Sequence, residues 1–350
     1  MPLKHDDDQN LLFGDGPAER AMEMVPPATV PPDVIANASR IPSSVHFGTS
    51  SWAFPGWRGI VFTERARADQ LARRGLAAYA RHPLFRTVGL DRAFYSLTSE
   101  RDAQGLAALV PDGFRFLVKA HQSVTRPDAD GAGGAFGNTR EHRTSGIANP
   151  RFLDPAWATD KVVGPAVAGF GNRLGPIVFQ FPPLALERFG GSSRFIDQIA
   201  RFLAALPRGP IMAVEVRNRE LFLPPAIEQY AAALASAHVA HGFAVHPTLP
   251  RLSSQVAALD AAGWPIERQP AVCVRWLLGH GHGYDEAKLR YEPFDKIVEP
   301  DPVSRETISA ILGRAIPSAR LSWIIANNKA EGSAPLTLLT LARTLFSPDQ

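Results

Sequence analysis

Eight short apolar segments, each followed by a segment whose apolar residues have helical spacing, repeat along most of this chain. Eight strand-and-helix units within about 300 residues is the number that closes a (β/α)8 barrel. The alternative is an open doubly wound sheet, which would place a G-x-G-x-x-G motif directly after the first strand. The first strand instead continues into GTSSWAFPGWRG, which lacks that spacing. We therefore predict an α/β fold, a (β/α)8 TIM-type barrel with eight parallel strands.

The predicted elements alternate regularly from residue 45 onward. Strands are expected within 45–52, 87–95, 114–121, 176–183, 211–218, 239–246, 271–278 and 321–329. Helices are expected at 68–82, 100–110, 155–172, 193–206, 224–237, 253–262, 302–315 and 333–346.

Two segments differ from this alternation. Residues 1–43 contain proline pairs and no sustained period, so we predict a flexible Pro-rich N-terminal tail there. Residues 44–347 are predicted to form a single barrel domain. A glycine-containing segment at about 122–150 follows the third strand and is predicted to be an inserted loop that forms a lid over the mouth of the barrel.

Composition narrows the classes of protein to consider. A formal net charge of +3 on 350 residues permits an acidic ligand but gives no argument for nucleic acid by itself. The single cysteine, Cys273, excludes an intrachain disulfide and a multi-cysteine zinc site. There is no apolar run long enough for a membrane span and no basic-then-apolar N-terminus, so we expect a cytoplasmic protein with no membrane partner. We expect no cofactor and no resident metal, and the oligomeric state is left open.

The strand predicted within IMAVEVRNREL carries charged residues where a buried parallel strand is normally apolar on both faces. Because side chains alternate along a strand, Val214 and Val216 share one face, and Glu215 and Arg217 share the other. If the valines face the surrounding helices, then Glu215 and Arg217 point into the barrel near its C-terminal mouth. Active sites of such barrels lie at that mouth.

The same alternation places polar residues at the inner ends of the other strands. Glu215, Lys119 and Asp91 are the candidate catalytic residues. The candidate substrate-binding residues at strand ends are Tyr95, His121, Gln180, Arg217, His246, Arg275, Asn327 and Asn328. Unpaired buried charge is expensive, so polar residues at six strand ends together indicate a site. The alternative is a structural ion-pair network, because two carboxylates and three cations can compensate one another.

Two tryptophans flank a Phe-Pro turn in GTSSWAFPGWRG. Trp52 and Trp57 either form an aromatic plug at one end of the barrel or provide a stacking wall for a ring-shaped substrate. In the second case Arg58 would contact an anionic group.

The chain resembles the YecE-like proteins, the domain of unknown function 72 family. The resemblance lies in GTSSWAFPGWRGIVF, FRTVGLDRAFYSL, PDGFRFLVKAHQSVT, LGPIVFQFPP, AVEVRNREL, the arginine of VCVRW and NNKAEGSAPLTLLTL, in the family's order. It implies a TIM-type barrel and no established reaction. Gly89 stands where the family commonly has glutamate, and Asp91 where asparagine is common, so this is a divergent member. A mechanism with two carboxylates would then need Asp91 as the second one.

Three functions compete. The first is an enzyme that acts on a small polar or anionic substrate, phosphoester or sugar-like, with Glu215 as general base and Lys119, Arg217 and Arg275 as anion contacts. The second is a metal-dependent hydrolase or nuclease, whose ligands would be Glu215, Asp91, His246 and either His280 or His282. The third is a non-catalytic barrel that binds a ligand or a partner protein.

An anion site is also predicted beyond the last strand. Ser333 has the residue type of a helix N-cap, so the amides of 332–334 would be free to point toward the mouth. Arg275 and Lys329 would add positive charge, and Glu331 would turn outward.

Overall fold

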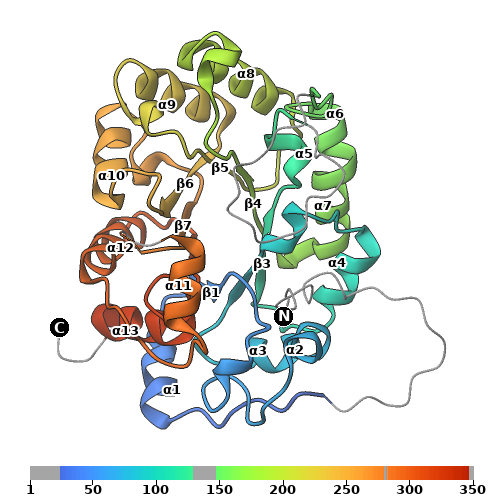
Figure 1. The fold of residues 1–350 in the computed structure, drawn as a ribbon, viewed down its shortest axis with the longest axis vertical. Coiled ribbons are helices and arrows are strands. Elements are labelled where there is room, and N and C mark those ends of the chain that lie inside the picture. The colour runs from blue at the N-terminus through green and yellow to red at the C-terminus, as the bar shows by residue number, and fades with distance from the viewer. Residues whose placement is uncertain (1–23, 129–146, 280, 282, 347–350) are drawn as a thin grey trace, which may run out of the picture.

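A closed barrel of eight parallel strands forms the centre of the molecule, with the strands paired in sequence order from β1 to β8 (Figure 1). The structure is a computed structural model that describes residues 24–128, 147–279, 281 and 283–346. The strands are β1 Val45–Thr49, β2 Thr87–Leu90, β3 Arg115–Lys119, β4 Leu174–Gln180, β5 Met212–Glu215, β6 Ala240–Val245, β7 Val272–Trp276 and β8 Ser322–Ala326. Five register pairs, from Val45 with Ser322 to Thr49 with Ala326, close the barrel between β1 and β8. The predicted (β/α)8 TIM-type barrel is confirmed.

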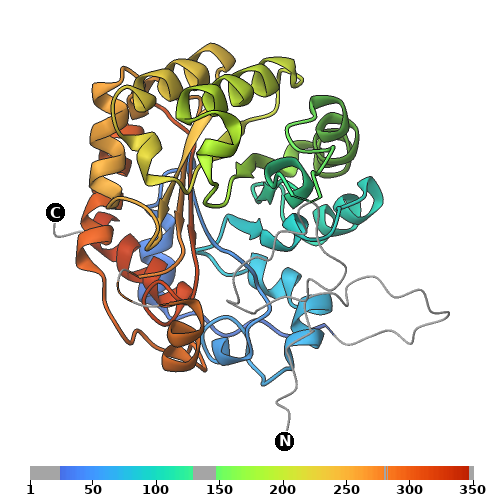
Figure 2. The same cartoon turned by 45° about the horizontal axis from the view of Figure 1, so that its top comes forward.

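Helices surround this barrel on the outside (Figure 2). The α-helices are α1 Pro32–Ser39, α2 Ala68–Arg74, α3 Leu76–Ala80, α4 Glu100–Ala107, α5 Gln122–Thr125, α6 Pro155–Ala158, α7 Gly164–Phe170, α8 Ser192–Ala205, α9 Ala226–Ala237, α10 Leu252–Ala261, α11 Tyr284–Tyr291, α12 Pro302–Ala315 and α13 Ala334–Phe346. Shorter helical turns are η1 Pro55–Trp57, η2 Asp91–Phe94, η3 Thr159–Val163, η4 Gly171–Arg173, η5 Leu186–Phe189, η6 Arg219–Phe222 and η7 Ile266–Arg268. None of the helices in the described chain is long and apolar enough to span a bilayer.

The two faces of the strands pack in two separate apolar clusters. The outward residues, such as Phe179 and Val214, join the large cluster between the strands and the helices. The inward residues form a second cluster that fills the barrel, made of Leu117, Val178, Ala213, Ala240, Ala271, Cys273, Trp323 and Ile325. Alternation along each strand therefore sorts the side chains as the sequence predicted. The next inward position above this second cluster is where the charged residues lie.

The N-terminal segment differs from the predicted flexible tail. Residues 32–39 form α1, which packs against α13 at the foot of the barrel in Figure 1. Val34, Ala38 and Ile41 are buried. They follow the helical i, i+4, i+7 spacing, and Pro32 occupies the first turn, where proline is tolerated. The prolines therefore begin a helix there, and residues 24–43 belong to the folded domain; residues 1–23 lie outside the described chain.

The predicted lid at 122–150 is described only at its two ends. Residues 122–125 form α5, and Asp128 pairs with Ala148 in an antiparallel bridge. Residues 129–146 lie outside the described chain, so a lid stays a prediction.

Candidate functional site

Four charged side chains form a continuous chain of ion pairs at the C-terminal mouth of the barrel. Arg217 donates from Nε to Oε1 of Glu215 at 2.6 Å. Arg275 donates from Nη1 to Oε2 of Glu215 at 2.9 Å, and from Nη2 to both oxygens of Asp91 at 2.8 and 3.0 Å. The sequence predicted that these residues meet, and the structure brings them together from β7, the end of β5 and the turn that follows β2.

The strand register explains how this cluster is positioned. Gln180 lies beside Glu215 in the pairing of β4 with β5, and both have the same inward parity as Val178 and Ala213 below them. On the other side of Glu215, a Cβ at Gly242 would lie 3.0 Å from the Cβ of Glu215. Glycine at this position of β6 therefore leaves room for the backbone and Cβ of Glu215.

Glu215 is wholly buried and permanently charged. Burial alone would raise the pKa of its carboxyl group, but Arg217, Arg275 and Lys119 together lower the pKa to about 2. Each of its two oxygens accepts a hydrogen bond from a guanidinium group. Each oxygen already has a guanidinium partner, and the low pKa leaves the carboxylate little basicity. This geometry favours Glu215 as the group that orients the two arginines and does not favour it as the general base, a role that stays a prediction.

Asp91 is the second carboxylate of the cluster. Gly89, where the family commonly has glutamate, faces the barrel interior with Ile325 and Ser50 as its nearest neighbours. Asp91, two residues later and in η2, reaches Arg275 instead. Burial lowers the pKa of Arg275, but the charges of Asp91 and Glu215 outweigh this effect and raise it. Arg275 is thus a fixed cation that links opposite sides of the mouth.

Lys119, at the end of β3, forms no salt bridge with a carboxylate of the described residues. Its side chain is only 7% exposed, and Nζ lies 3.7 Å from the centre of the Phe94 ring. Burial is the largest cause of a lowered pKa, and the neighbouring Arg275 adds to it, so that the pKa of Lys119 falls to about 7. Asp91 and Glu215 oppose this shift but do not cancel it. Lys119 can therefore exchange a proton near neutral pH.

Three polar groups beside the ion pairs make no hydrogen bond to any residue in the described chain. They are Nζ of Lys119, the side-chain amide of Gln180 and Nη1 of Arg217, on residues that are 7%, 8% and 6% exposed. The polar atoms of these three side chains are not themselves enclosed, so they keep access to solvent at three adjacent strand ends. Amine, amide and guanidinium groups such as these can donate hydrogen bonds to an anion and to a polar group next to it.

Three further predicted residues lie at the rim. Tyr95 is 43% exposed; burial and then the charge of Asp91 raise its pKa, so it lies near the cluster. His121 and His246 are half-buried at the ends of β3 and β6. Their Nδ1 atoms lie 2.8 Å from hydroxyl oxygens two residues later, those of Ser123 and Thr248. These histidines stabilise the turns that leave the strands.

The two tryptophans belong to the core, so the aromatic plug describes them and the stacking wall does not. Trp57 is fully buried against Phe54 and Tyr79, and Trp52 donates from Nε1 to the carbonyl oxygen of Leu71 at 3.1 Å. Arg58 is exposed, and no side-chain contact in the described chain joins it to the cluster.

Asn327 and Asn328 join β8 to its surroundings. Asn327 donates from Nδ2 to Oγ of Ser50 at 2.8 Å. Oδ1 of Asn328 accepts from Nε1 of Trp57 at 3.1 Å and from the amide of Ala334 at 2.9 Å. Both contacts of Oδ1 lie within the fold, and the predicted role of Asn328 in substrate binding stays a prediction.

The predicted anion site at the start of α13 is wrong. Asn328 accepts from the amides of Gly332 and Ala334, so neither is free. Ser333 is fully buried, and Glu331 is buried and paired with Arg305. The N-terminus of this helix is therefore closed by the protein itself.

The proposed metal ligands do not assemble in the described chain. No group of three or more histidine, cysteine, aspartate or glutamate side chains there is arranged to hold a metal ion. His246 faces Thr248, while Glu215 and Asp91 are bound by arginines. His280 and His282 lie outside the described residues.

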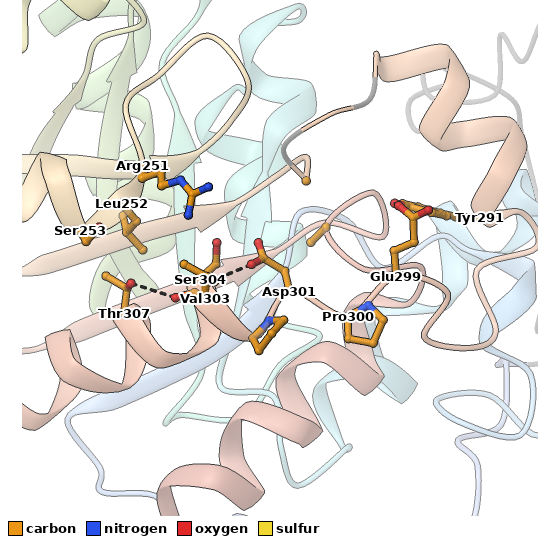
Figure 3. A pocket seen from close by; sticks show the side chains of 13 residues that line it. Arg251, Leu252, Ser253, Tyr291, Glu299, Pro300, Asp301, Val303, Ser304 and Thr307 are labelled. Carbon is orange, nitrogen blue, oxygen red and sulfur yellow. Dashed lines mark hydrogen bonds between the residues drawn. The ribbon is translucent and has the colours of Figure 1, made fainter.

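A cavity that the sequence did not predict lies beside the mouth, between the segments that follow β6, β7 and β8 (Figure 3). It has a volume of about 300 Å³, and the side chains of Arg251 and Asp301 extend toward it from different sides. Asp301 also accepts from the amide of Ser304 at 2.9 Å, as the N-cap of α12. An aspartate directly before Pro302 is a recognisable helix start, but nothing in the spacing of Arg251 indicates that it lies opposite.

Comparisons with known proteins agree with the resemblance found in the motifs. Residues 46–349 match the family described as Protein of unknown function DUF72. A DUF72 family protein from Thermotoga maritima is similar in structure, with a TM-score of 0.57, 18% sequence identity, and coverage of 86% of this chain and 98% of that one. A DUF72 family protein from Enterococcus faecalis has a TM-score of 0.53 at 14% identity, with coverage of 87% and 99%. No curated protein matches the sequence.

Proposed function

The chain belongs to the DUF72 family of proteins of unknown function, and from that premise we propose that its barrel is an enzyme for a small anionic substrate, with Lys119 as the proton-transferring group. The mouth of the barrel holds the substrate. Arg217 and Gln180 bind its anionic group, and Lys119 takes or gives a proton nearby. Glu215, Arg275 and Asp91 hold this arrangement in place.

The observation that carries the proposal is the set of unsatisfied groups, Lys119, Gln180 and Arg217. The carboxylates of the ion-pair network already accept from arginines, whereas these three donors have no partner among the described residues and keep access to solvent. They are therefore available to a ligand that enters the mouth. An anion supplies acceptors for them, and charge-assisted hydrogen bonds to it are about twice as strong as neutral ones.

The role of Lys119 follows from its environment. A general base works best when its pKa lies near the working pH. Lys119, with a pKa of about 7, meets that condition, whereas the carboxyl group of Glu215, with a pKa of about 2, does not. The same mouth supports phosphoester or sugar-like substrates, since both present oxygens to arginine and amide donors.

Titration calorimetry with inorganic phosphate tests the anion site. We expect binding by the wild-type chain, and a loss of about tenfold or more in affinity for Arg217→Gln, as for the loss of a charge-assisted contact. Arg219→Gln is the matched control, because Arg219 is exposed and lies two residues farther along the same segment. Equal affinity in Arg217→Gln and the wild type would contradict the proposal.

A further inference from the structure

We propose that Lys119 is a nucleophile that forms an imine with a small aldehyde or ketone carrying one anionic group. This inference rests on the proposed function, because the anionic group would bind at the site already described. It adds a substrate class and a covalent step.

The first argument is the distribution of partners around Lys119. Glu215 and Asp91 are the carboxylates whose charges act on it. Both oxygens of each one already accept from an arginine. No carboxylate within the described residues therefore pairs with the Lys119 amine, which lies against the face of Phe94 instead. A lysine kept for structure would be expected to have an ion-pair partner at this depth.

The second argument is the electrostatic environment of the amine. Arg275 and Arg217 act on Lys119 as like charges, and His121 and Lys161 line the same cleft. Burial and the neighbouring arginines disfavour the protonated form of Lys119. Asp91, Glu215 and the Phe94 ring favour the protonated form. An unprotonated lysine amine is the form that attacks carbonyl carbon, and desolvation beside another cation is how such lysines are activated.

The covalent step needs no oxidant or reductant. The Lys119 nitrogen donates its electron pair to the carbonyl carbon, and a carbon–nitrogen bond forms. The carbonyl oxygen takes up protons and leaves as water, while the nitrogen loses its two hydrogens. The product is an imine, which becomes a cation when it takes one proton from solvent.

The surroundings also define the size and charge of the substrate. The cleft next to Lys119 has a volume of only about 10 Å³, and its lining includes Val118, Phe170, Thr98, His121 and Lys161. Gln180 ends β4, and Arg217 lies two residues beyond the end of β5. The substrate is larger than this cleft, so we expect its carbonyl carbon to reach Lys119 from the mouth, with the anionic end toward Arg217.

Reductive trapping tests the inference. The full chain is incubated at neutral pH with glyoxylate and cyanoborohydride, and the modified lysine is located by peptide mass spectrometry. We expect Lys119 to be modified at least tenfold faster than any other lysine. Lys119→Met and Lys119→Arg should remove this fast phase. Lys329→Met should keep it, because Lys329 is a comparably buried lysine that lies over the Tyr284 ring.

The outcomes separate the two proposals. Modification spread evenly over the lysines, or a fast phase that persists in both Lys119 variants, would overturn the imine. If inorganic phosphate binds and Lys119 is not modified, the anion site stands and the imine falls. If uncharged acetaldehyde modifies Lys119 as fast as glyoxylate does, the reactive amine stands and the anion site falls.

Discussion

Glu215 shows how far a single residue can be interpreted from its position in the sequence. Its inward direction follows from the parity of one strand, and that prediction is correct. Its chemical role depends on which groups occupy its two oxygens, and those groups come from positions 217 and 275. Spacing indicates that the three residues can meet but not that both oxygens are taken. These two contacts are the reason why the structure does not favour Glu215 as the general base.

Glu215→Gln is expected to destabilise the fold by about 3 kcal/mol or more, since it leaves two buried arginines without the negatively charged partner that they share. The lowered pKa of Glu215 contributes stability that is complete above about pH 4.5 and is lost as the pH falls toward about 2. Urea unfolding at several pH values measures both effects. Glu228→Gln, at an exposed position on α9, is the control and should change little. Equal stability of the two variants at pH 7 would contradict this account.

Lys119→Met is expected to stabilise the protein, most strongly below about pH 7. There the wild-type fold must bury a protonated amine, at a cost that the methionine avoids. As pH rises from about 7 toward 10.5, folded Lys119 is neutral while the unfolded chain still binds the proton, so wild-type stability rises. The slope is about 1.4 kcal/mol per pH unit at most. A difference between variant and wild type that is independent of pH would show that Lys119 is not desolvated.

At the scale of elements, the strands were easier to predict than the N-terminal helix. Each strand is an apolar run between a helix and a turn, and the number of such runs predicted the barrel. The α1 segment has only eight residues and follows proline pairs, which also suit an extended tail. Its apolar face is recognisable only together with Ile41, which lies beyond the end of the helix.

Removing residues 24–43 is expected to lower the melting temperature by several degrees or more. The loss exposes the surface under Val34, Ala38 and Ile41, and it removes the carbonyl oxygens of Pro42 and Ile41 that accept from Arg86 at 2.6 and 3.0 Å. The measurement compares chains that begin at residues 24 and 44. Equal melting temperatures would mean that α1 is only loosely attached.

Asn328→Ala should cost about 2 kcal/mol or more, because it leaves the indole of Trp57 and the amide of Ala334 without their acceptor. Both groups are fully or almost fully buried, so water does not replace the lost bonds. Chemical unfolding followed by tryptophan fluorescence measures the change. Asn172→Ala is the control, since Asn172 is an exposed asparagine. A cost equal to that of the control would contradict the structural role of Asn328.

For the whole molecule, Arg275 and Trp323 divide the barrel interior into two parts. Above, Arg275 joins carboxylates from β5 and from the turn after β2 across the mouth. Below, Trp323 stacks on His46 with ring centres 4.8 Å apart and fills space that Ala213, Ala240 and Ala271 leave. The alternation predicted which residues point inward. It did not predict that one large ring would be matched by small residues on other strands, because that match depends on volumes across the barrel.

This division leads to a prediction about the lower part. Trp323→Leu should destabilise the barrel by about 3 kcal/mol, because the facing alanines cannot fill the cavity that it leaves. Trp323→Phe should cost clearly less. It keeps a ring against His46, and it removes the indole Nε1, which is buried without a hydrogen-bond partner among the described residues. Urea unfolding of the two variants beside the wild type measures the order. A phenylalanine variant less stable than the leucine variant would contradict this account, because it would show that the volume of the ring against His46 and the alanines does not determine the cost.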